Sequence, residues 1–329
     1  AWDYPGSRFV GVDLAELPLA AARKFSEQLG LSNIEFQQGD LTTWSAPGSE
    51  FDYILVHGVF SWVPPAARAG ILRICQQHLA PQGVAFISYN SLPGCYFRKF
   101  IWDMLRFHTR GIDDPEEKVA SAREFAEKAI GALDDKGHPG VIRSELRELL
   151  ERHESVVFHD DLAGINEPFY VEEFTALAQQ HGLQYLGDAD PVREHGLPYQ
   201  VSTEDRGKER QYADFATARR ALETLLCREG LALAPSIELP RLLNLWVSSK
   251  AAPAPEQEDG TQTFTLAQDR SLSTNHPVAK ALLLAAGKAW PEMIRANSLP
   301  YPGLDPAADL DCVVRLMMTG ALEFRLEPP

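Results

Sequence analysis

The 329-residue sequence has few cysteines, no long apolar run and a shortage of basic residues. Its four cysteines, Cys75, Cys95, Cys227 and Cys312, are too widely spaced for a zinc site and too few for a disulfide-rich secreted scaffold. We therefore expect a reduced, cytoplasmic setting. No stretch of about 18 or more apolar residues is present, and no basic start precedes an apolar run, so neither a membrane span nor an export signal is expected.

Basic residues number 31 against 46 acidic ones, which gives a formal net charge of −15. Nucleic-acid affinity rests mainly on basic side chains that neutralise phosphates, so no nucleic-acid partner is expected. No metal site is expected either. Hydrophobic residues at 45% and charged residues at 23% are typical of a folded protein, and the length favours two or three domains.

Predicted strands and helices alternate through the first ninety residues. Strands are expected at 8–13, 34–40, 51–56 and 84–89, helices at 14–30 and 65–79, and a turn at 81–83. Such alternation predicts a parallel sheet with crossover helices, a Rossmann-like doubly wound α/β fold. A further helix at 170–181 and a strand at 183–187 are expected to complete the sheet.

The predicted domains follow from this pattern. Residues 1–93 form the core, 94–167 a helical insertion and regulatory region, 168–205 a return to the core sheet, and 206–329 a C-terminal winged-helix-like α+β domain. In the last segment we expect a long helix at 210–229, a linker at 251–263, helices near 277–286, 291–296 and 306–319, and a strand at 321–326. Its helices lack a basic face, so we expect acceptor selection or a structural cap rather than DNA binding.

Two acids directly follow predicted strands. Ligands of a doubly wound sheet lie outside the carboxyl ends of its strands, where Asp13 and Asp40 are placed on adjacent loops. Asp13 can accept hydrogen bonds from both hydroxyls of a ribose, with Leu14 beside it. Asp40 can accept from an exocyclic adenine amine, while the Leu41 backbone N–H faces a ring nitrogen. The alternative for each acid is a cap on the following segment.

Further candidates follow the next two strands. The loop His57-Gly58-Val59 is expected to line the same crevice, with Gly58 permitting a close backbone approach to the cofactor. Histidine side chains ordinarily titrate near neutrality, so His57 is a candidate base, although it can instead bond only its own loop. Tyr89 and Asn90 offer neutral oxygens that can bind an amine, or simply end a strand. His159 is a further candidate base.

These segments together resemble the class I S-adenosylmethionine-dependent methyltransferases. The resemblance is carried by Asp13, Gly39-Asp40, the strand beginning Phe51-Asp52-Tyr53-Ile54 and the turn at 79–83. A narrower resemblance is to methyltransferases with a methyltransferase regulatory domain; it rests on residues 57–64, Tyr89-Asn90 with Pro93-Gly94, 159–162 with 166–168, and Arg219-Arg220 with 224–227.

The resemblance implies S-adenosyl-L-methionine as cofactor. Because that family includes bacterial protein lysine methyltransferases of outer-membrane proteins, it also implies methyl transfer to a protein lysine. The rival interpretations are methylation of a small molecule and a non-catalytic, cofactor-binding scaffold, and a homodimer is one expected assembly. No Gly-x-Gly run precedes Asp13, so the family's first strand and its glycine-rich loop are expected upstream of this sequence.

Overall fold

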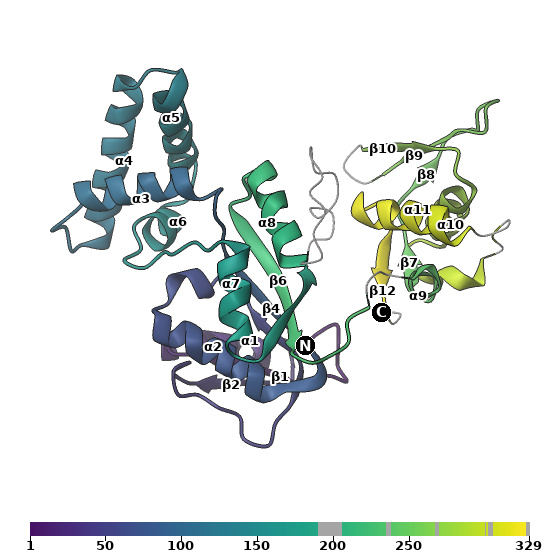
Figure 1. Cartoon of the computed structure of the whole chain (residues 1–329), viewed down its shortest axis with the longest axis horizontal. Helices are drawn as coiled ribbons and strands as arrows, with labels where there is room; N and C mark the ends of the chain where they lie inside the picture. Colours follow the sequence, from purple (N-terminus) through teal and green to yellow (C-terminus); the bar gives the residue numbers. More distant parts are fainter. Residues whose placement is uncertain (190–205, 235–237, 267–269, 300, 302–304, 327–329) are drawn as a thin grey trace. The chain divides into compact units, whose positions relative to one another are not determined.

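The computed structural model describes residues 1–189, 206–234, 238–266, 270–299, 301 and 305–326. It divides into two compact units, Ala1–Leu231 and Ala232–Pro329 (Figure 1). The first unit contains β1 (Phe9–Asp13), α1 (Glu16–Gln28), β2 (Ile34–Gln38), β3 (Phe51–Val56), the 3₁₀ helix η1 (Phe60–Trp62), α2 (Pro65–His78), β4 (Leu79–Asn90), α3 (Tyr96–His108), α4 (Pro115–Ala132), α5 (Gly137–Leu150), α6 (Glu154–Val156), the π-helical turn η2 (Val157–Asp161), α7 (Val171–Gln179), β5 (Leu183–Asp188), α8 (Arg206–Thr217) and β6 (Ala221–Arg228). This order confirms the predicted α/β fold.

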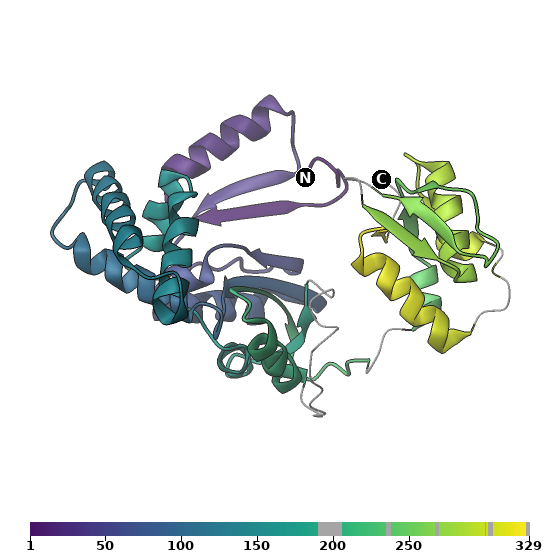
Figure 2. The same ribbon diagram turned by 90° about the horizontal axis from the view of Figure 1, so that it is seen from above.

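The strands of the first unit form two sheets. In the smaller one β1 runs parallel to β2, and in the larger one the order is β3-β4-β6-β5, with β3 parallel to β4 and β6 antiparallel to both its neighbours. Among the described residues β1 and β3 each have one partner strand, so each leaves an edge open. Figure 2 shows β1 and β2 pointing toward the side where α3, α4 and α5 lie, which is also where β4 ends.

The larger sheet carries the core of the unit. Helices α2 and α7 pack on one of its faces through buried residues such as Leu72 and Phe174. Strands β4 and β6 contribute Ile87, Tyr89 and Leu226 to the same cluster. Because side chains of a strand alternate between faces, every second residue near the end of β4 faces this core.

Residues 94–167 contain α3, α4, α5, α6 and η2, as expected for a helical insertion. These helices have a hydrophobic core of their own, which includes Leu105, Ala122, Leu146 and Val157. The insertion therefore packs as a separate bundle within the first unit. Its connections to the sheet are short segments at either end.

The single helix predicted at 210–229 is wrong. Helix α8 ends at Thr217, and the chain then forms β6, in which Leu222, Thr224 and Leu226 are buried by alternation. The spacing of the leucines fits the two-residue period of a strand as well as the period of a helix. Antiparallel pairing with β4 makes this segment a strand. The unit boundary consequently lies after Leu231, not at 206. The turn predicted at 81–83 is part of β4, and residues 190–205 lie outside the described residues.

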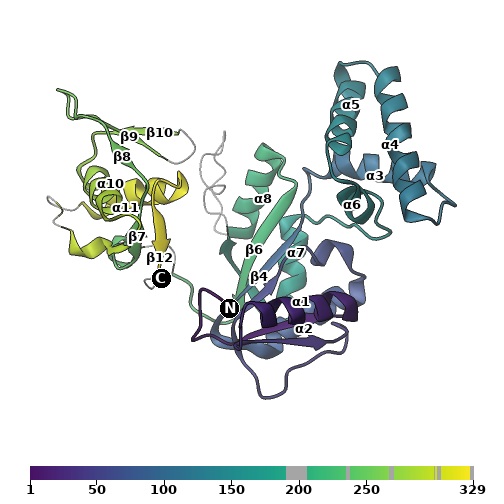
Figure 3. The same cartoon turned by 180° about the vertical axis from the view of Figure 1, so that it is seen from behind.

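The second unit contains α9 (Leu239–Leu243), β7 (Trp246–Ser248), β8 (Ala252–Pro253), β9 (Gln262–Thr265), β10 (Ser271–Thr274), α10 (Pro277–Ala289), β11 (Ile294–Arg295), the 3₁₀ helix η5 (Ala296–Ser298), α11 (Pro306–Met318) and β12 (Glu323–Arg325). Its sheets have the orders β10-β9-β8 and β11-β7-β12, and α10 contacts α11 (Figure 3). The helix predicted at 291–296 is wrong, because β11 and η5 occupy it. The predicted linker at 251–263 instead holds β8 and the start of β9. The winged-helix-like arrangement is therefore not confirmed.

Candidate functional site

Asp13 and Asp40 lie on neighbouring loops at the ends of two parallel strands. Strand β1 pairs with β2 so that Asp13 is opposite Gln38. The backbone N–H of Gly39 donates to the carbonyl oxygen of Asp13 at 2.9 Å, which ties the two loops together. Both acids are exposed. The two acids thus lie on adjacent loops, as predicted.

Each carboxylate uses one oxygen to hold its own loop. Asp13 Oδ1 accepts from the Ala15 backbone N–H at 2.8 Å, and Asp40 Oδ1 accepts from the Thr42 N–H at 2.8 Å and the Thr42 hydroxyl at 2.7 Å. The Thr42 hydroxyl and then its N–H lower the pKa of the Asp40 carboxyl, because they stabilise its ionised form. Neither Oδ2 atom makes a hydrogen bond within the described part of the chain. One oxygen of each acid therefore shapes the loop, and the other is open to a ligand.

Leu14 and Leu41 follow these acids in different surroundings. Leu14 is 66% exposed, and its carbonyl accepts from the Gln38 side chain at 3.1 Å. Leu41 packs against the core beneath α2, and a Cβ on Gly70 would lie only 2.1 Å from its carbonyl oxygen. The close approach of α2 fixes the loop. The Leu41 backbone N–H, expected to face a ring nitrogen, has no partner among the described residues.

The loop after β3 is shaped by Gly58. Its φ of 67° is a left-handed conformation that favours glycine, and its N–H donates to Ser88 Oγ at 2.8 Å. His57 is exposed and stacks on the Phe86 ring, with centroids 6.0 Å apart. Val59 is half-buried and precedes η1. The loop therefore lies across the ends of β3 and β4 with the imidazole at the surface.

Tyr89 does not present its phenol to an acceptor, and the structure corrects that prediction. The side chain is 1% exposed, its ring stacks on Phe174 at 4.2 Å between centroids, and its hydroxyl hydrogen-bonds Thr224 Oγ1 at 3.1 Å. Burial raises the pKa of this phenol well above its ordinary value. Alternation along β4 places Tyr89 on the core face, so it cannot act as a base for an external substrate.

Asn90 lies at the very end of β4 and is partly exposed. Its backbone N–H donates to Ser61 Oγ at 2.8 Å, and its carbonyl accepts from the Phe169 N–H at 2.9 Å. Its side-chain Nδ2 donates to Asn166 Oδ1 at 2.7 Å. The Oδ1 atom of Asn90 makes no hydrogen bond within the described chain. Asn90 thus keeps the free neutral oxygen that the sequence predicts at this position.

The segment after η2 is joined to the same strand ends. The Glu167 N–H donates to the Ser61 carbonyl at 2.9 Å, and its carboxylate forms an ion pair with the buried Arg68. Phe169 pairs as a parallel bridge with Ser91. His159 is exposed, and its ring lies edge-on to that of Phe158 with the ring centroids 5.3 Å apart. Within the described residues Asn166 hydrogen-bonds Asn90, whereas no hydrogen bond joins the predicted base His159 to the strand ends.

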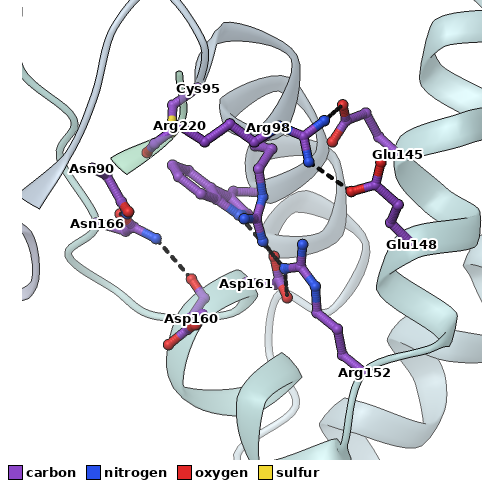
Figure 4. Close-up of polar contacts among 11 residues, drawn as sticks. Asn90, Cys95, Arg98, Glu145, Glu148, Arg152, Asp160, Asp161, Asn166 and Arg220 are labelled. Carbon is purple, nitrogen blue, oxygen red and sulfur yellow. Dashed lines mark hydrogen bonds and ion pairs between the residues drawn. The ribbon is translucent and has the colours of Figure 1, made fainter. Parts of the chain in front are cut away.

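Ion pairs around the buried Asp161 and around the half-exposed Arg220 hold the helical insertion in place (Figure 4). Asp161 is 2% exposed and accepts from Trp102 Nε1 at 2.9 Å and from Arg152 at 2.9 Å, with Arg98 at 3.3 Å. Directly before β6, Arg220 donates to Glu148 at 2.6 Å. It also pairs with Glu145, whose pKa is raised by burial. These contacts fix α3, α5 and η2 beside the end of β4.

Sequence reasoning missed Arg68, Trp102, Arg98 and Arg152. Arg68, Arg98 and Trp102 are ordinary members of helical patterns, and Arg152 follows the end of a helix. The acidic partner of each lies 9 to 99 positions away. The only local signal was Asp160-Asp161, a pair of acids within an otherwise apolar run. Such a pair needs cations when buried, but it does not say which ones.

Comparisons with known proteins agree with this arrangement. Residues 1–83 match the model of a methyltransferase domain, and residues 153–228 match that of a predicted methyltransferase regulatory domain. The uncharacterized protein RP789 of Rickettsia prowazekii (strain Madrid E) is 32% identical over 298 residues, covering 85% of this chain and 54% of that protein. RP028 of the same organism is 29% identical over 185 residues, covering 56% of this chain and 74% of that protein. The chain thus spans about half the length of RP789.

Two solved structures are also similar. The structure of PKMT2 from Rickettsia typhi superposes with a TM-score of 0.83 at 26% identity, covering 99% of this chain and 68% of that one. The same protein in complex with AdoHcy gives a TM-score of 0.79 at the same identity and coverage. In the described residues no helix is long and apolar enough to span a membrane, and no group of three or more His, Cys, Asp or Glu side chains is arranged to hold a metal ion.

Proposed function

Because this chain belongs to the class I methyltransferases that carry a methyltransferase regulatory domain, we propose that it transfers the methyl group of S-adenosylmethionine to a lysine amine of a protein. The observation that carries the proposal is the pair of strand-end carboxylates, Asp13 and Asp40. The two acids lie on adjacent loops, and each has a free Oδ2. These oxygens can accept hydrogen bonds from the hydroxyls of a ribose and from an adenine amine.

The described residues fit the adenosine half of this cofactor. Asp13 would accept from the ribose hydroxyls, with Leu14 beside the sugar, and Asp40 would accept from the exocyclic amine, with the Leu41 N–H toward the ring. Charge-assisted hydrogen bonds of this kind contribute about 1.5–3 kcal/mol each. We propose that the ends of β1 and β2 and those of β3 and β4 line one crevice, with His57, Gly58 and Val59 between the cofactor and the acceptor.

The acceptor side of the proposal rests on Asn90 and His57. Asn90 offers a neutral Oδ1 at the end of β4, which suits an amine N–H, and His57 is an exposed imidazole on the adjoining loop. The net charge of −15 favours approach of a cationic, lysine-bearing protein over an acidic one. Further support comes from the likeness to PKMT2 of Rickettsia typhi and from the AdoHcy in its complex.

S-adenosylmethionine, when bound, supplies a methyl carbon on a positively charged sulfur. The lysine nitrogen attacks that carbon, the new N–C bond forms as the C–S bond breaks, and the sulfur keeps the electron pair. Holding nitrogen, carbon and sulfur in line can supply several kcal/mol of barrier reduction. The lysine, with an ordinary pKa of about 10.4, must first lose a proton, which we assign to His57 or to solvent.

The proposal is tested in two steps on the full-length protein. Calorimetry with S-adenosylmethionine measures binding, and incubation with bacterial lysate and methyl-labelled cofactor, followed by mass spectrometry, identifies the product. We expect saturable binding and labelled lysine in protein. Label found only in small molecules would instead identify a small-molecule methyltransferase, and binding without any labelled product would identify a scaffold. Either of these last results contradicts lysine methylation.

A further inference from the structure

Asn166 is a buried amide whose two ends face different parts of the molecule (Figure 4). It is 5% exposed, its Nδ2 donates to the carbonyl oxygen of Asp160 at 2.9 Å, and its Oδ1 accepts from Asn90 Nδ2 at 2.7 Å. A carbonyl oxygen can only accept, so the Nδ2 end of Asn166 must face Asp160. The Oδ1 end must then face Asn90, and one backbone carbonyl sets the orientation of both amides.

The carbonyl that sets this orientation is itself held firmly. Asp160 lies in η2 directly before Asp161, whose buried carboxylate accepts from Trp102 and Arg152 at 2.9 Å. Breaking a buried ion pair of this kind is strongly destabilising, because it leaves an uncompensated charge. The Asp160 carbonyl is therefore a fixed point of the helical insertion.

The other side of Asn166 is held by the sheet. The next residue, Glu167, donates its N–H to the Ser61 carbonyl at 2.9 Å, and Phe169 donates to the Asn90 carbonyl at 2.9 Å. Leu92 in turn donates to the Phe169 carbonyl at 2.9 Å. Asn166 thus lies between two anchored segments, one in the insertion and one at the end of β4.

We infer that Asn166 is a positioning residue that keeps Asn90 Oδ1, rather than Asn90 Nδ2, available to the acceptor amine. The inference deepens the proposed function and rests on it. If Asn166 is removed, the Asn90 amide is free to turn by 180° and present an N–H donor, which offers nothing to an amine N–H. The insertion thereby contributes to catalysis through one hydrogen-bonded amide.

The amide is also better suited than a carboxylate to this position. A carboxylate beside the acceptor would favour the ammonium form and raise the lysine pKa, whereas the reaction needs the neutral amine. An oriented neutral oxygen binds one N–H and leaves the nitrogen lone pair free for the methyl group. Asn90→Asp should therefore change the pH dependence of the methylation rate.

The decisive comparison is between Asn166→Ala and Asn166→Asp. Asn166→Ala removes the partner of Asn90 and should lower kcat roughly tenfold, the equivalent of about one hydrogen bond, with the Kd for S-adenosylmethionine unchanged. Asn166→Asp keeps an oxygen facing Asn90 Nδ2 in either protonation state, so it should retain most of kcat even if its Tm falls. In Asn90→Asp, the acidic limb of the pH–rate profile, where the acceptor lysine loses its proton, should shift to higher pH.

The assays use the full-length protein, S-adenosylmethionine and the lysate protein that the wild type labels most strongly. The control is Asn297→Ala, which removes an Asn–Asn bond of the same length, 2.7 Å to Asn244, in the second unit. It should leave kcat unchanged. In an Asn90→Ala background, Asn166→Ala should lower kcat no further, since the oxygen that it orients is already gone.

Three results would overturn the inference. They are equal losses of kcat in Asn166→Ala and Asn166→Asp, an additive loss in the double variant, and an unchanged kcat in a folded Asn166→Ala protein. If the wild-type protein binds the cofactor but labels no lysine, the proposed function itself is overturned before any variant is compared. The failures of the two ideas are thereby distinguishable.

Discussion

Tyr89 and Asn90 are consecutive residues of β4 whose side chains lie on opposite sides of the sheet. Tyr89 is buried against Phe174, with ring centroids 4.2 Å apart, while Asn90 donates a 2.7 Å hydrogen bond to Asn166. This follows from the two-residue period of a strand. Of these two neutral oxygens, only that of Asn90 is available to a substrate at the strand end.

The first prediction concerns Tyr89→Phe, which removes the phenol hydroxyl and its bond to Thr224 at 3.1 Å. We expect the free energy of unfolding to fall by about 1 kcal/mol, with kcat and the cofactor Kd unchanged. Denaturant titration and steady-state rates measure these quantities. Thr224→Val breaks the same bond from the other side and should give a similar loss of stability. A large fall in kcat without a change in stability would show that the phenol meets the substrate.

The second prediction concerns the left-handed backbone at Gly58. Gly58→Ala places a Cβ in open space but at a φ of 67°, so strain alone should lower stability by about 1–2 kcal/mol. Gly30→Ala is the matched control, because Gly30 has the same φ and the same open surroundings at the end of α1. Thermal unfolding should register both changes similarly, and only Gly58→Ala should also reduce methyl transfer. Equal rates in the two variants would remove the 57–59 loop from the site.

The third prediction concerns pH and Asp214. Burial raises the pKa of this carboxyl to about 7, although Arg210 beside it acts to lower it. An unfolded aspartate titrates near 4, so between about pH 4 and 7 the folded chain holds a proton that the unfolded chain has lost. The free energy of unfolding must then fall as pH rises through this window. Asp214→Asn should flatten that fall.

Urea titrations between pH 5 and 8 provide the measurement for Asp214. Asp103→Asn is the comparison, because Asp103 is an exposed acid that pairs with Arg106 on α3. It should keep the pH dependence of the wild type. Parallel curves for wild type and Asp214→Asn would mean that this carboxyl is ionised throughout the range.

The sequence predicts the sheet better than it predicts what surrounds it. The apolar runs that end in Asp13 and near Asp40 identify strands and loops correctly, because each strand end is a local pattern. The spacing of Leu222 and Leu226 predicts a helix where the chain forms a strand, since leucines spaced four apart suit a helix as well as a buried strand. Only its pairing with β4 distinguishes the two, and pairing is not a local property.

The site shows the same division. Asn90 and Asn166 each stand out as polar residues at a strand or loop end, but the sequence does not indicate that they bond one another across 76 positions. The burial of Tyr89 was foreseeable from alternation with Ile87, which lies on the same face. The ion pairs of Arg68 and Arg220 could not be predicted from the sequence, because each arginine pairs with an acid more than 70 positions away.

The central claim is that Asp13 and Asp40 hold the nucleoside of S-adenosylmethionine. Its most direct test is calorimetric titration of the cofactor into the folded full-length protein and its Asp13→Ala variant. Asp259→Ala is the control, because Asp259 is an exposed acid that also accepts a backbone N–H two residues on, at 2.9 Å, in the second unit. We predict that Asp13→Ala weakens binding by about 1.5–3 kcal/mol, roughly 10- to 150-fold, that Asp40→Ala weakens it less, and that Asp259→Ala has no effect. An unchanged cofactor Kd in Asp13→Ala would contradict the account.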